Sequence, residues 1–347
     1  MTTVALDAMG SDLGPQATVA GGAAATLSPE APDLILVGDL PTIRRNLLVN
    51  RHDPAKVEVV HANDVVTQDD PATAAVHLGE SSISVAAQLV RKGDADVLVS
   101  AGNTGAVVLA SARHFQRLPG VDRAALGAVY PTERRRGDRD DPFSLILDAG
   151  LTLEVTADDL VAFAVMGSAY AARISKNERP RVALLNIGSE PGKGTRAICE
   201  AFGRLEGAEG LDFIGNIEGT DIPKGTADVV VTAGFTGNIV LKMLEGVAET
   251  AIRLGRYAGD QSLRYKAGLA LLAPAARKLR DVTDWQQYGG APILGFDHLV
   301  IKAHGRSTAR AITNAVKVAS RAARTGLVDA MRTGLEARPG QAASGEG

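Results

Sequence analysis

Short apolar runs alternate with longer amphipathic segments along most of this chain. Apolar runs bounded by glycine and polar residues are typical of β-strands, whereas the longer segments repeat apolar residues at helical spacing. The clearest helix is predicted at 157–174, because Thr156 can cap it and Asp158 and Asp159 stand in its first turn. The pattern predicts ten strands, at 4–6, 34–37, 57–60, 97–100, 126–130, 144–147, 181–186, 212–214, 229–232 and 298–302.

These strands predict a sheet that is covered on both faces. Several of them are apolar at every position, which is typical of parallel strands between two layers of helices. We therefore predict a doubly wound α/β architecture with a mostly parallel sheet flanked by helices. Residues 1–335 are enough for a single α/β domain with a large core, or for two lobes that share the sheet. The small polar residues of 336–347 predict a disordered tail.

Two stretches of the chain are near copies of each other. Residues 95–110 read ADVLVSAGNTGAVVLA and residues 227–242 read ADVVVTAGFTGNIVLK, so they agree at ten of sixteen positions. Each predicts a strand, an Ala-Gly-x-Thr-Gly turn and a helix. Such a turn lets backbone N–H groups approach a ligand, and the helix dipole attracts negative charge. The pair predicts an anion site between two halves of the protein, although shared packing rules alone also make such units alike.

Composition narrows the class of protein. Hydrophobic residues make up 45% of the 347 residues and charged residues 22%, as in ordinary soluble proteins. A net charge of −3 and an aromatic content of 4% argue against a nucleic-acid partner. The single cysteine, Cys199, excludes an internal disulfide framework. The pattern contains no secretion signal and no spanning segment, so the chain is expected in the cytoplasm.

Ligands of open α/β sheets bind beyond the carboxyl ends of strands. Three loops that follow predicted strands read DAMGSD, NIGSEPGKGT and KAHGRS, and they supply glycines, hydroxyls, amides and lysines suited to an anion. The second resembles a Walker A loop but is one residue short, and glycine follows its lysine, which disfavours a nucleoside triphosphatase. No HExxH, CxxC or GxSxG motif occurs, and no GxGxxG follows the first strand. Neither a metal site, a serine acyl-enzyme nor a Rossmann dehydrogenase is therefore expected.

Nine segments of the chain resemble the bacterial phosphate acyltransferase family, PlsX. They are DAMGSD at 7–12, LVGD at 36–39, SAGNTGA at 100–106, FAVMGSAYA at 163–171, LLNIGSEPGKG at 184–194, FIGNIEG at 213–219, GFTGNIVLKMLEG at 234–246, YGGAPILG at 288–295 and IKAHG at 301–305. The matches occur in order and span nearly the whole chain. The resemblance implies a fold like that of isocitrate and isopropylmalate dehydrogenases and of phosphotransacetylase.

The same resemblance implies an enzyme that moves a fatty acyl group from acyl carrier protein to inorganic phosphate. Its product, acyl phosphate, feeds a membrane glycerol-3-phosphate acyltransferase that begins phospholipid synthesis. The family works as a homodimer, and the reaction requires no cofactor, metal or covalent enzyme intermediate. The protein must instead cradle phosphate, stabilise the developing oxyanion and exclude water.

Site residues follow from the loops and the resemblance together. Three catalytic residues are expected. Lys193 would stabilise the developing charge, and Asn103 would help to bind phosphate. His304 would protonate the leaving sulfur or only bind phosphate. Asp7 and Asp12 suit a loop-shaping role as well as a substrate contact. The expected phosphate-binding or substrate-binding residues are Asp7, Gly10, Asp12, Gly102, Thr104, Gly105, Asn186, Gly188, Gly194, Gly234, Thr236, Gly237, Asn238 and Lys302.

Three positions depart from the family pattern. Gly79 stands in a segment where the family carries positive charge, Leu151 replaces an asparagine, and Ala233 replaces an aspartate. These departures leave two alternatives open. One is a divergent paralogue that binds or regulates but has lost or altered its chemistry, and the other is an acyltransferase that uses a different thioester donor, such as a coenzyme A thioester.

The segment 263–282, LRYKAGLALLAPAARKLRDV, predicts a helical projection near 255–285. Basic residues surround its apolar middle, as in a helix that lies on a membrane surface, and a helical hairpin at a dimer interface explains the pattern equally well. Pro274 is expected to divide the segment into two short helices. The family resemblance favours weak peripheral membrane association through this region or through the partner acyltransferase.

Overall fold

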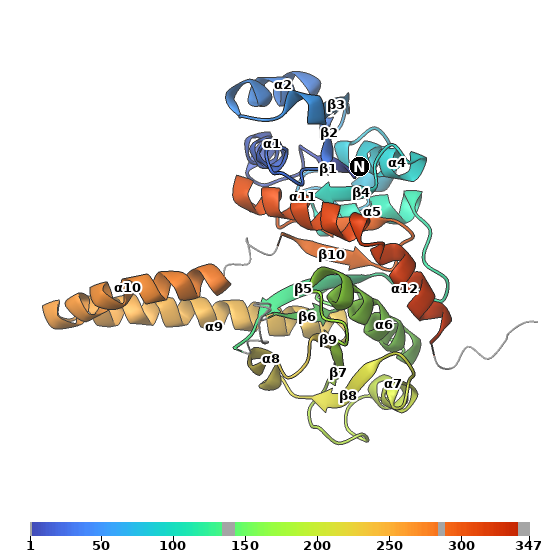
Figure 1. The fold of residues 1–347 in the computed structure, drawn as a ribbon, viewed down its shortest axis with the longest axis vertical. Coiled ribbons are helices and arrows are strands. Elements are labelled where there is room, and N and C mark those ends of the chain that lie inside the picture. Colours follow the sequence, from blue (N-terminus) through green and yellow to red (C-terminus); the bar gives the residue numbers. More distant parts are fainter. Residues whose placement is uncertain (1, 134–142, 284–288, 339–347) are drawn as a thin grey trace, which may run out of the picture.

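A computed structural model describes residues 2–133, 143–283 and 289–338 of the chain (Figure 1). The strands assigned there are β1 (Thr3–Asp7), β2 (Asp33–Gly38), β3 (Val57–His61), β4 (Val97–Ser100), β5 (Ala125–Pro131), β6 (Phe143–Leu147), β7 (Arg181–Leu185), β8 (Asp212–Ile217), β9 (Val229–Val231), β10 (Ala291–Leu294) and β11 (Leu299–Lys302). The α-helices are α1 (Gly14–Ala25), α2 (Leu40–Val49), α3 (Ala74–His77), α4 (Ser82–Lys92), α5 (Thr104–His114), α6 (Ala157–Ile174), α7 (Arg196–Leu205), α8 (Asp221–Lys224), α9 (Gly234–Asp260), α10 (Leu263–Thr283), α11 (Ala309–Arg324) and α12 (Leu327–Glu336). A 3₁₀ turn, η1 (Pro54–Lys56), precedes β3.

The strands form one sheet in the order β3-β2-β1-β4-β11-β10-β5-β6-β9-β7-β8. Pairs are parallel within the first half, β3 to β11, and within the second half, β6 to β8. Three antiparallel pairs, β11 with β10, β10 with β5 and β5 with β6, join the halves. All ten predicted strands are confirmed, as is the mostly parallel sheet. The short β10 was missed, because its apolar run contains a proline and follows two glycines.

The direction of each strand decides where the loops lie. Three antiparallel pairs separate β4 from β9, so these two strands run in opposite directions. The carboxyl ends of the two halves therefore leave the sheet at opposite edges. This arrangement governs which of the predicted site residues can meet.

Helices cover both faces of the sheet, as the strand composition predicts. The largest core packs α1, α6, α11 and α12 against one face, while α4 and α5 cover the other face in the first half and α8 and α9 cover it in the second. Helix α6 begins with the predicted cap: Thr156 Oγ1 accepts from the Asp159 N–H at 3.2 Å, and the Asp159 carboxylate accepts from the Thr156 N–H at 2.9 Å. Helix α12 ends at Glu336, and residues 339–347 of the predicted tail lie outside the described residues.

Helices α9 and α10 form a hairpin that projects from the body of the molecule (Figure 1). Pro274 lies inside α10, so the prediction of two short helices was wrong. Packing between the two helices favours a single element, and Gly259 of α9 lies directly against the Leu269 side chain. Four apolar side chains spaced four residues apart along α9 are at least half exposed: Phe235 (60%), Ile239 (50%), Met243 (65%) and Val247 (58%). Within the described residues, no helix combines the length and the hydropathy needed to cross a membrane.

Candidate active site

The carboxyl ends of β1, β4 and β11 lie side by side and bring three polar side chains together. Asp7 pairs with Ser100 in the strand register, and Ser100 pairs with Lys302. The buried Asp7 carboxylate accepts from Ser100 Oγ at 2.7 Å and from the Met9 N–H at 3.2 Å. These contacts fix the loop after β1 against the first Ala-Gly-x-Thr-Gly turn. Asp7 thus makes contacts that shape the loop, which is one of the two roles expected from its position in the sequence.

Two glycines let the backbones of these loops touch. A Cβ atom on Gly10 would lie 2.8 Å from Gly102 Cα and 2.9 Å from Asp7 Oδ2, which is closer than real side chains pack. The Gly102 N–H donates to Ser100 Oγ at 3.0 Å. Because a side chain on Gly10 would push the loops apart, glycine is required there, whereas a Cβ on Gly102 would lie 3.1 Å from Ser100 Oγ and would need only a small shift.

Lys302 is the charged residue at the centre of this group. Its side chain is only 7% exposed, and its Nζ donates to the carbonyl of Ala303. Burial lowers the pKa of Lys302 from 10.5 to about 8, although the carboxylates of Asp12 and Asp7 act in the opposite direction. At pH 7 the amine still holds its proton in most molecules, so the site contains a buried cation. Such a cation suits an anionic ligand.

The loop after β11 presents His304 above Lys302. Burial, followed by the positive charges of Lys302 and Lys242, lowers the pKa of His304, so the ring is neutral at pH 7. The Arg306 N–H donates to His304 Nδ1 at 3.2 Å, which assigns the ring proton to Nε2. His304 is therefore a hydrogen-bond donor through Nε2. The loop itself is tied to the first one, since the Asp12 N–H donates to the Gly305 carbonyl at 2.9 Å.

The first Ala-Gly-x-Thr-Gly turn leads into α5. Asn103 caps this helix, because its Oδ1 accepts from the Ala106 N–H at 3.1 Å while its Nδ2 donates to the Gln68 carbonyl at 3.3 Å. Its side chain is thus occupied in shaping the turn. Thr104 and Gly105 form the first helical turn, where a Cβ on Gly105 would lie 2.7 Å from the Ala72 side chain. Helices α1, α5 and α11 all follow strands that end at this edge of the sheet, so their positive dipole ends lie at the edge that carries Lys302.

The second Ala-Gly-x-Thr-Gly turn starts α9 and packs against protein rather than opening toward Lys302. A Cβ on Gly237 would lie 1.9 Å from the Asp148 carbonyl oxygen, and one on Gly234 would lie 2.6 Å from Asp148 Oδ2. The Gly234 N–H donates to the Thr152 carbonyl at 2.8 Å. Thr236 and Asn238 are exposed beside it. The turn therefore serves as a close helix–loop contact.

Asp148 organises the second region, which consists of the loop after β6 and the start of α9, and sequence reasoning missed this residue. Its buried carboxylate accepts from the backbone N–H groups of four residues, at 2.6 to 3.1 Å; they are Leu126, Gly150, Leu151 and Thr152. Burial raises the pKa of Asp148, and these four donors oppose that rise. An Asp-Ala-Gly sequence after an apolar strand was its only visible signal.

Two of the departures from the family pattern lie in this second region. Leu151 donates its N–H to Asp148, and its side chain packs partly into the core beside α5. Ala233 is the N-cap of α9 and supplies no side-chain hydrogen bond, so the cap that an aspartate would provide is missing. Gly79 lies elsewhere, before α4, where its carbonyl accepts from Gln88 Nε2 at 3.2 Å. None of these three residues touches the Lys302 group in the contacts that the structure describes.

The loop between β7 and α7 lies at the carboxyl edge of the second half. Asn186 holds the loop closed, since its Nδ2 donates to the Lys193 carbonyl at 2.8 Å, and Gly194 takes a positive φ of 96° against the Asn186 side chain. Gly188 is buried beneath this loop. The Lys193 side chain is exposed, and within the described part of the chain no hydrogen bond or ion pair links it to the Lys302 group. The structure thus separates Lys193 from His304 and Asn103.

Helix α9 connects the second region to the first. It runs back along the sheet from Gly234, and Lys242 and Glu245 on its flank are close enough to His304 to affect its pKa. Lys242 is eight residues beyond Gly234, or about 12 Å along the helix. Within the described residues no hydrogen bond joins the two turns, whereas α9 brings the basic side chain of Lys242 near His304 in the first region. Sequence reasoning missed Lys242, Ser100 and Gln68, whose Nε2 donates to the Gly10 and Ala101 carbonyls at 3.2 and 3.1 Å, because nothing local indicates what these side chains face.

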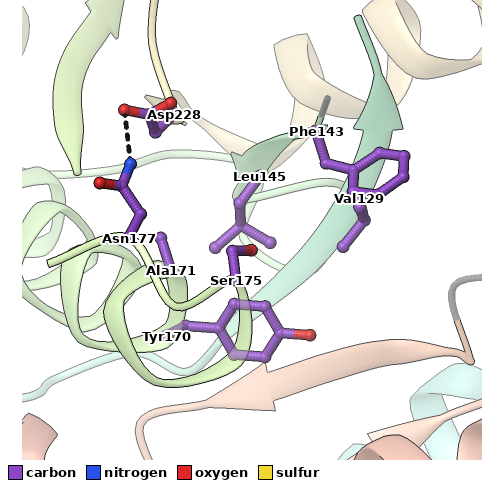
Figure 2. Close-up of a pocket in the computed structure, with 8 residues that line it drawn as sticks. All are labelled: Val129, Phe143, Leu145, Tyr170, Ala171, Ser175, Asn177 and Asp228. Carbon is purple, nitrogen blue, oxygen red and sulfur yellow. Dashed lines mark hydrogen bonds between the residues drawn. The ribbon is translucent and has the colours of Figure 1, made fainter. Parts of the chain in front are cut away.

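Figure 2 shows a different cavity, of about 20 Å³, in the second half of the molecule. Residues of β5, β6 and α6 line it, together with Asn177 and Asp228, whose side chains are joined by a 3.1 Å hydrogen bond. Asp228 also accepts from the Arg181 N–H at 2.7 Å and pairs with the Arg181 guanidinium at 3.3 Å. The space suits about one water molecule. It is a structural cavity and does not accommodate a thioester substrate.

Comparison with known proteins gives consistent matches along the chain. A family model described as "Fatty acid synthesis protein" matches residues 2–330. The phosphate acyltransferase of Brevibacillus brevis is 40% identical over 319 residues, which are 92% of this chain and 92% of that protein. The phosphate acyltransferase of Myxococcus xanthus is 43% identical over 325 residues, covering 93% of this chain and 90% of that protein.

Solved structures give the same fold. A phosphotransacetylase from Streptococcus pyogenes superposes with a TM-score of 0.64 at 17% identity, covering 93% of this chain and 94% of that chain. A putative 4-hydroxythreonine-4-phosphate dehydrogenase from Salmonella typhimurium superposes with a TM-score of 0.51 at 15% identity, covering 92% and 99%. At such identities these likenesses bear on the fold alone, and they confirm the architecture expected from the sequence.

Proposed function

Because this chain belongs to the phosphate acyltransferase family, we propose that it transfers a fatty acyl group from acyl carrier protein to inorganic phosphate. A phosphate oxygen attacks the thioester carbonyl and forms a tetrahedral oxyanion. The carbon–sulfur bond then breaks, acyl phosphate leaves, and the carrier's thiolate takes up a proton. No group on the protein needs to form a covalent bond in this sequence.

One observation carries the assignment of the site, namely the buried ammonium of Lys302 at the edge where α1, α5 and α11 begin. We assign phosphate to this position, with the Lys302 charge and the first-turn N–H groups of α5 as its ligands. We assign His304 Nε2–H as a donor to phosphate or to the oxyanion, since Nδ1 already accepts from the Arg306 N–H. The charge-stabilising role expected of Lys193 passes to Lys302, because Lys302 is buried with the other groups while Lys193 is exposed at the opposite edge.

The departures from the family pattern favour an active enzyme over a paralogue without chemistry. Leu151 and Ala233 lie beside Asp148, where they affect the packing and capping of α9. Every polar contact within the Asp7, Ser100 and Lys302 group is independent of them. The alternative of a different acyl donor, such as a coenzyme A thioester, is tested by comparing the rates with the two thioesters in one assay.

The proposal includes a homodimer and peripheral contact with the membrane. The apolar stripe of α9, from Phe235 to Val247, supports a second copy as its cover, because such a stripe is costly to leave in water. Leu263, Leu271 and Leu272 on α10 are 61 to 86% exposed and support membrane contact near the hairpin tip, where the product would pass to a glycerol-3-phosphate acyltransferase. We also propose a cytoplasmic location, as the sequence pattern leads us to expect.

The test is phosphate-dependent consumption of acyl carrier thioester by the purified chain, with acyl phosphate trapped as a hydroxamate. Wild-type protein should form acyl phosphate, and Lys302→Met should lose about 100-fold or more in kcat. Lys92→Met, which removes an exposed lysine elsewhere, should retain activity. Thioester loss that does not depend on phosphate would contradict the proposed function.

A further inference from the structure

Helix α11 carries an unusual charge distribution for this protein. The whole chain has a net charge of −3, yet residues 309–324 contain four basic residues and neither aspartate nor glutamate. The basic residues are spaced by seven, four and three positions, which places them on one face of the helix. All four are exposed: Arg310, Lys317, Arg321 and Arg324. We call this set the α11 ridge.

The opposite face of α11 is buried, so the ridge is held in a fixed orientation. Ile312, Ala315 and Ala319 lie in the main core under the helix. Helix α1 packs along its side, where Thr313 Oγ1 donates to the Gly21 carbonyl at 2.8 Å. A rigid helix presents charges at set distances, and a partner helix can match such a pattern.

Among the residues that the structure describes, no carboxylate forms an ion pair with Lys317 or Arg321, the two middle residues of the ridge. The neighbouring α1 contains no charged residue between Gly14 and Ala25. At the distal end, Arg324 pairs with Glu30 at 3.8 Å and donates to its carbonyl at 3.1 Å. At the proximal end, Asp12 lies beside the loop that carries His304. Lys317 and Arg321 therefore form the middle of an extended positive surface.

The ridge starts at the candidate active site. Helix α11 begins seven residues after Lys302, and the connecting loop contains His304 and a further exposed arginine, Arg306. From Arg310 to Arg324 the ridge runs about 21 Å along the helix. Phosphate needs no surface of this length, and the acyl group is uncharged. The feature suits a large acidic partner whose reactive end must reach Lys302.

We propose that the α11 ridge docks the acidic acyl carrier protein and directs its prosthetic arm toward Lys302, an inference that rests on the proposed function. Charge complementarity of this kind steers association and sets orientation. A lipid surface fits the ridge less well. Helices that lie on membranes insert exposed apolar side chains, whereas the exposed residues of α11 are its basic ones.

The test compares two double variants with the same change in net charge. Lys317→Glu/Arg321→Glu reverses the middle of the ridge, away from the groups that hold phosphate. Arg44→Glu/Arg51→Glu reverses two exposed arginines remote from α11 in sequence, one in the middle of α2 and one just after that helix ends. Each variant is assayed with acyl carrier protein and with the acyl thioester of pantetheine, which has the arm without the protein.

The ridge variant should raise KM for acyl carrier protein about tenfold, with kcat and KM for phosphate unchanged. Its KM for acyl pantetheine should match wild type, and its KM for the carrier should depend less on salt. The α2 variant should behave as wild type. Equal effects in both variants, no effect in the ridge variant, or an effect on KM for phosphate alone would overturn the inference.

Two further measurements separate this inference from the proposed function and from membrane binding. Anisotropy of labelled carrier reports docking without turnover, so a chain that binds carrier through the ridge but forms no acyl phosphate would contradict the proposed function alone. Flotation with anionic vesicles reports lipid binding. Loss of vesicle binding in the ridge variant, with carrier affinity intact, would assign the ridge to the membrane and refute docking.

Discussion

Replacing Lys302 by methionine should make the protein more stable while it abolishes most of its activity. The Lys302 side chain is 7% exposed, and burial lowers its pKa from 10.5 to about 8. A shift of about 2.5 units corresponds to about 3 kcal/mol of free energy that the folded state spends on holding the charged amine. Methionine has a similar length and no charge to bury, so the free energy of unfolding at pH 7 should rise by about 2–3 kcal/mol.

The sign of the pH dependence follows from the direction of the shift. Between pH 8 and 10.5 the unfolded chain holds the Lys302 proton and the folded chain releases it, so wild-type stability rises with pH in that window. The variant lacks this group. Its advantage over wild type should therefore be constant below about pH 8 and shrink toward zero near pH 10.5.

Urea unfolding of both proteins at several pH values measures this difference, and Lys92→Met controls for removal of an exposed lysine. Phosphate provides a second readout, since a bound anion should raise the stability of wild type by mass action and leave the variant unaffected. If Lys302→Met proves less stable than wild type at pH 7, or if its advantage is the same at pH 10, the buried-cation argument is wrong.

Three further predictions concern the start of α9. Ala233→Asp should supply the missing N-cap of α9 and raise the free energy of unfolding by about 1 kcal/mol. Ala233→Glu adds the same charge but caps poorly, so it should not stabilise the protein. Equal stabilisation by both variants in thermal melts would exclude capping as the cause. Gly237→Ala should prevent normal folding, because its Cβ would lie 1.9 Å from the Asp148 carbonyl oxygen. Gly246→Ala, on the open flank of the same helix, should raise the free energy of unfolding by up to about 1 kcal/mol. Equal effects of the two variants in circular dichroism melts would contradict the packing argument. Asp148→Asn should lower the free energy of unfolding, measured in urea, by about 2–4 kcal/mol, because one amide oxygen cannot accept from four N–H donors. The matched change at an exposed position, Asp122→Asn, should have little effect. A loss below about 1 kcal/mol for Asp148→Asn would show that its carboxylate is dispensable.

Local signals in the sequence were enough to locate part of the site. The apolar strand before Asp7 and the glycines at 10 and 102 identify loops at a sheet edge, because such residues allow close backbone approach wherever they occur. The sequence does not show which is buried: Lys193, in the loop after β7, or Lys302, at the end of β11. Their difference is burial, which depends on neighbouring strands drawn from distant parts of the chain.

The duplicated turns illustrate the same limit. Their shared Ala-Gly-x-Thr-Gly sequence correctly predicts a strand, a tight turn and a helix in both places. The antiparallel pairs around β10 and β5 reverse one of the two strands, so the turns that follow them leave the sheet at opposite edges. β10, whose short run was not recognised, is the strand that would have revealed the reversal.

The sequence by itself determined the alternation of strands and helices, the covered sheet, the glycine turns and the family, because periodicity, backbone restrictions and ordered motifs are properties of neighbouring residues. Only the tertiary structure decided which lysine is desolvated, what each turn packs against, and that α11 aligns its basic residues beside the site. Desolvation and electrostatic fields depend on distances between groups remote in the chain, and those distances exist only once the sheet has set the order and direction of its strands.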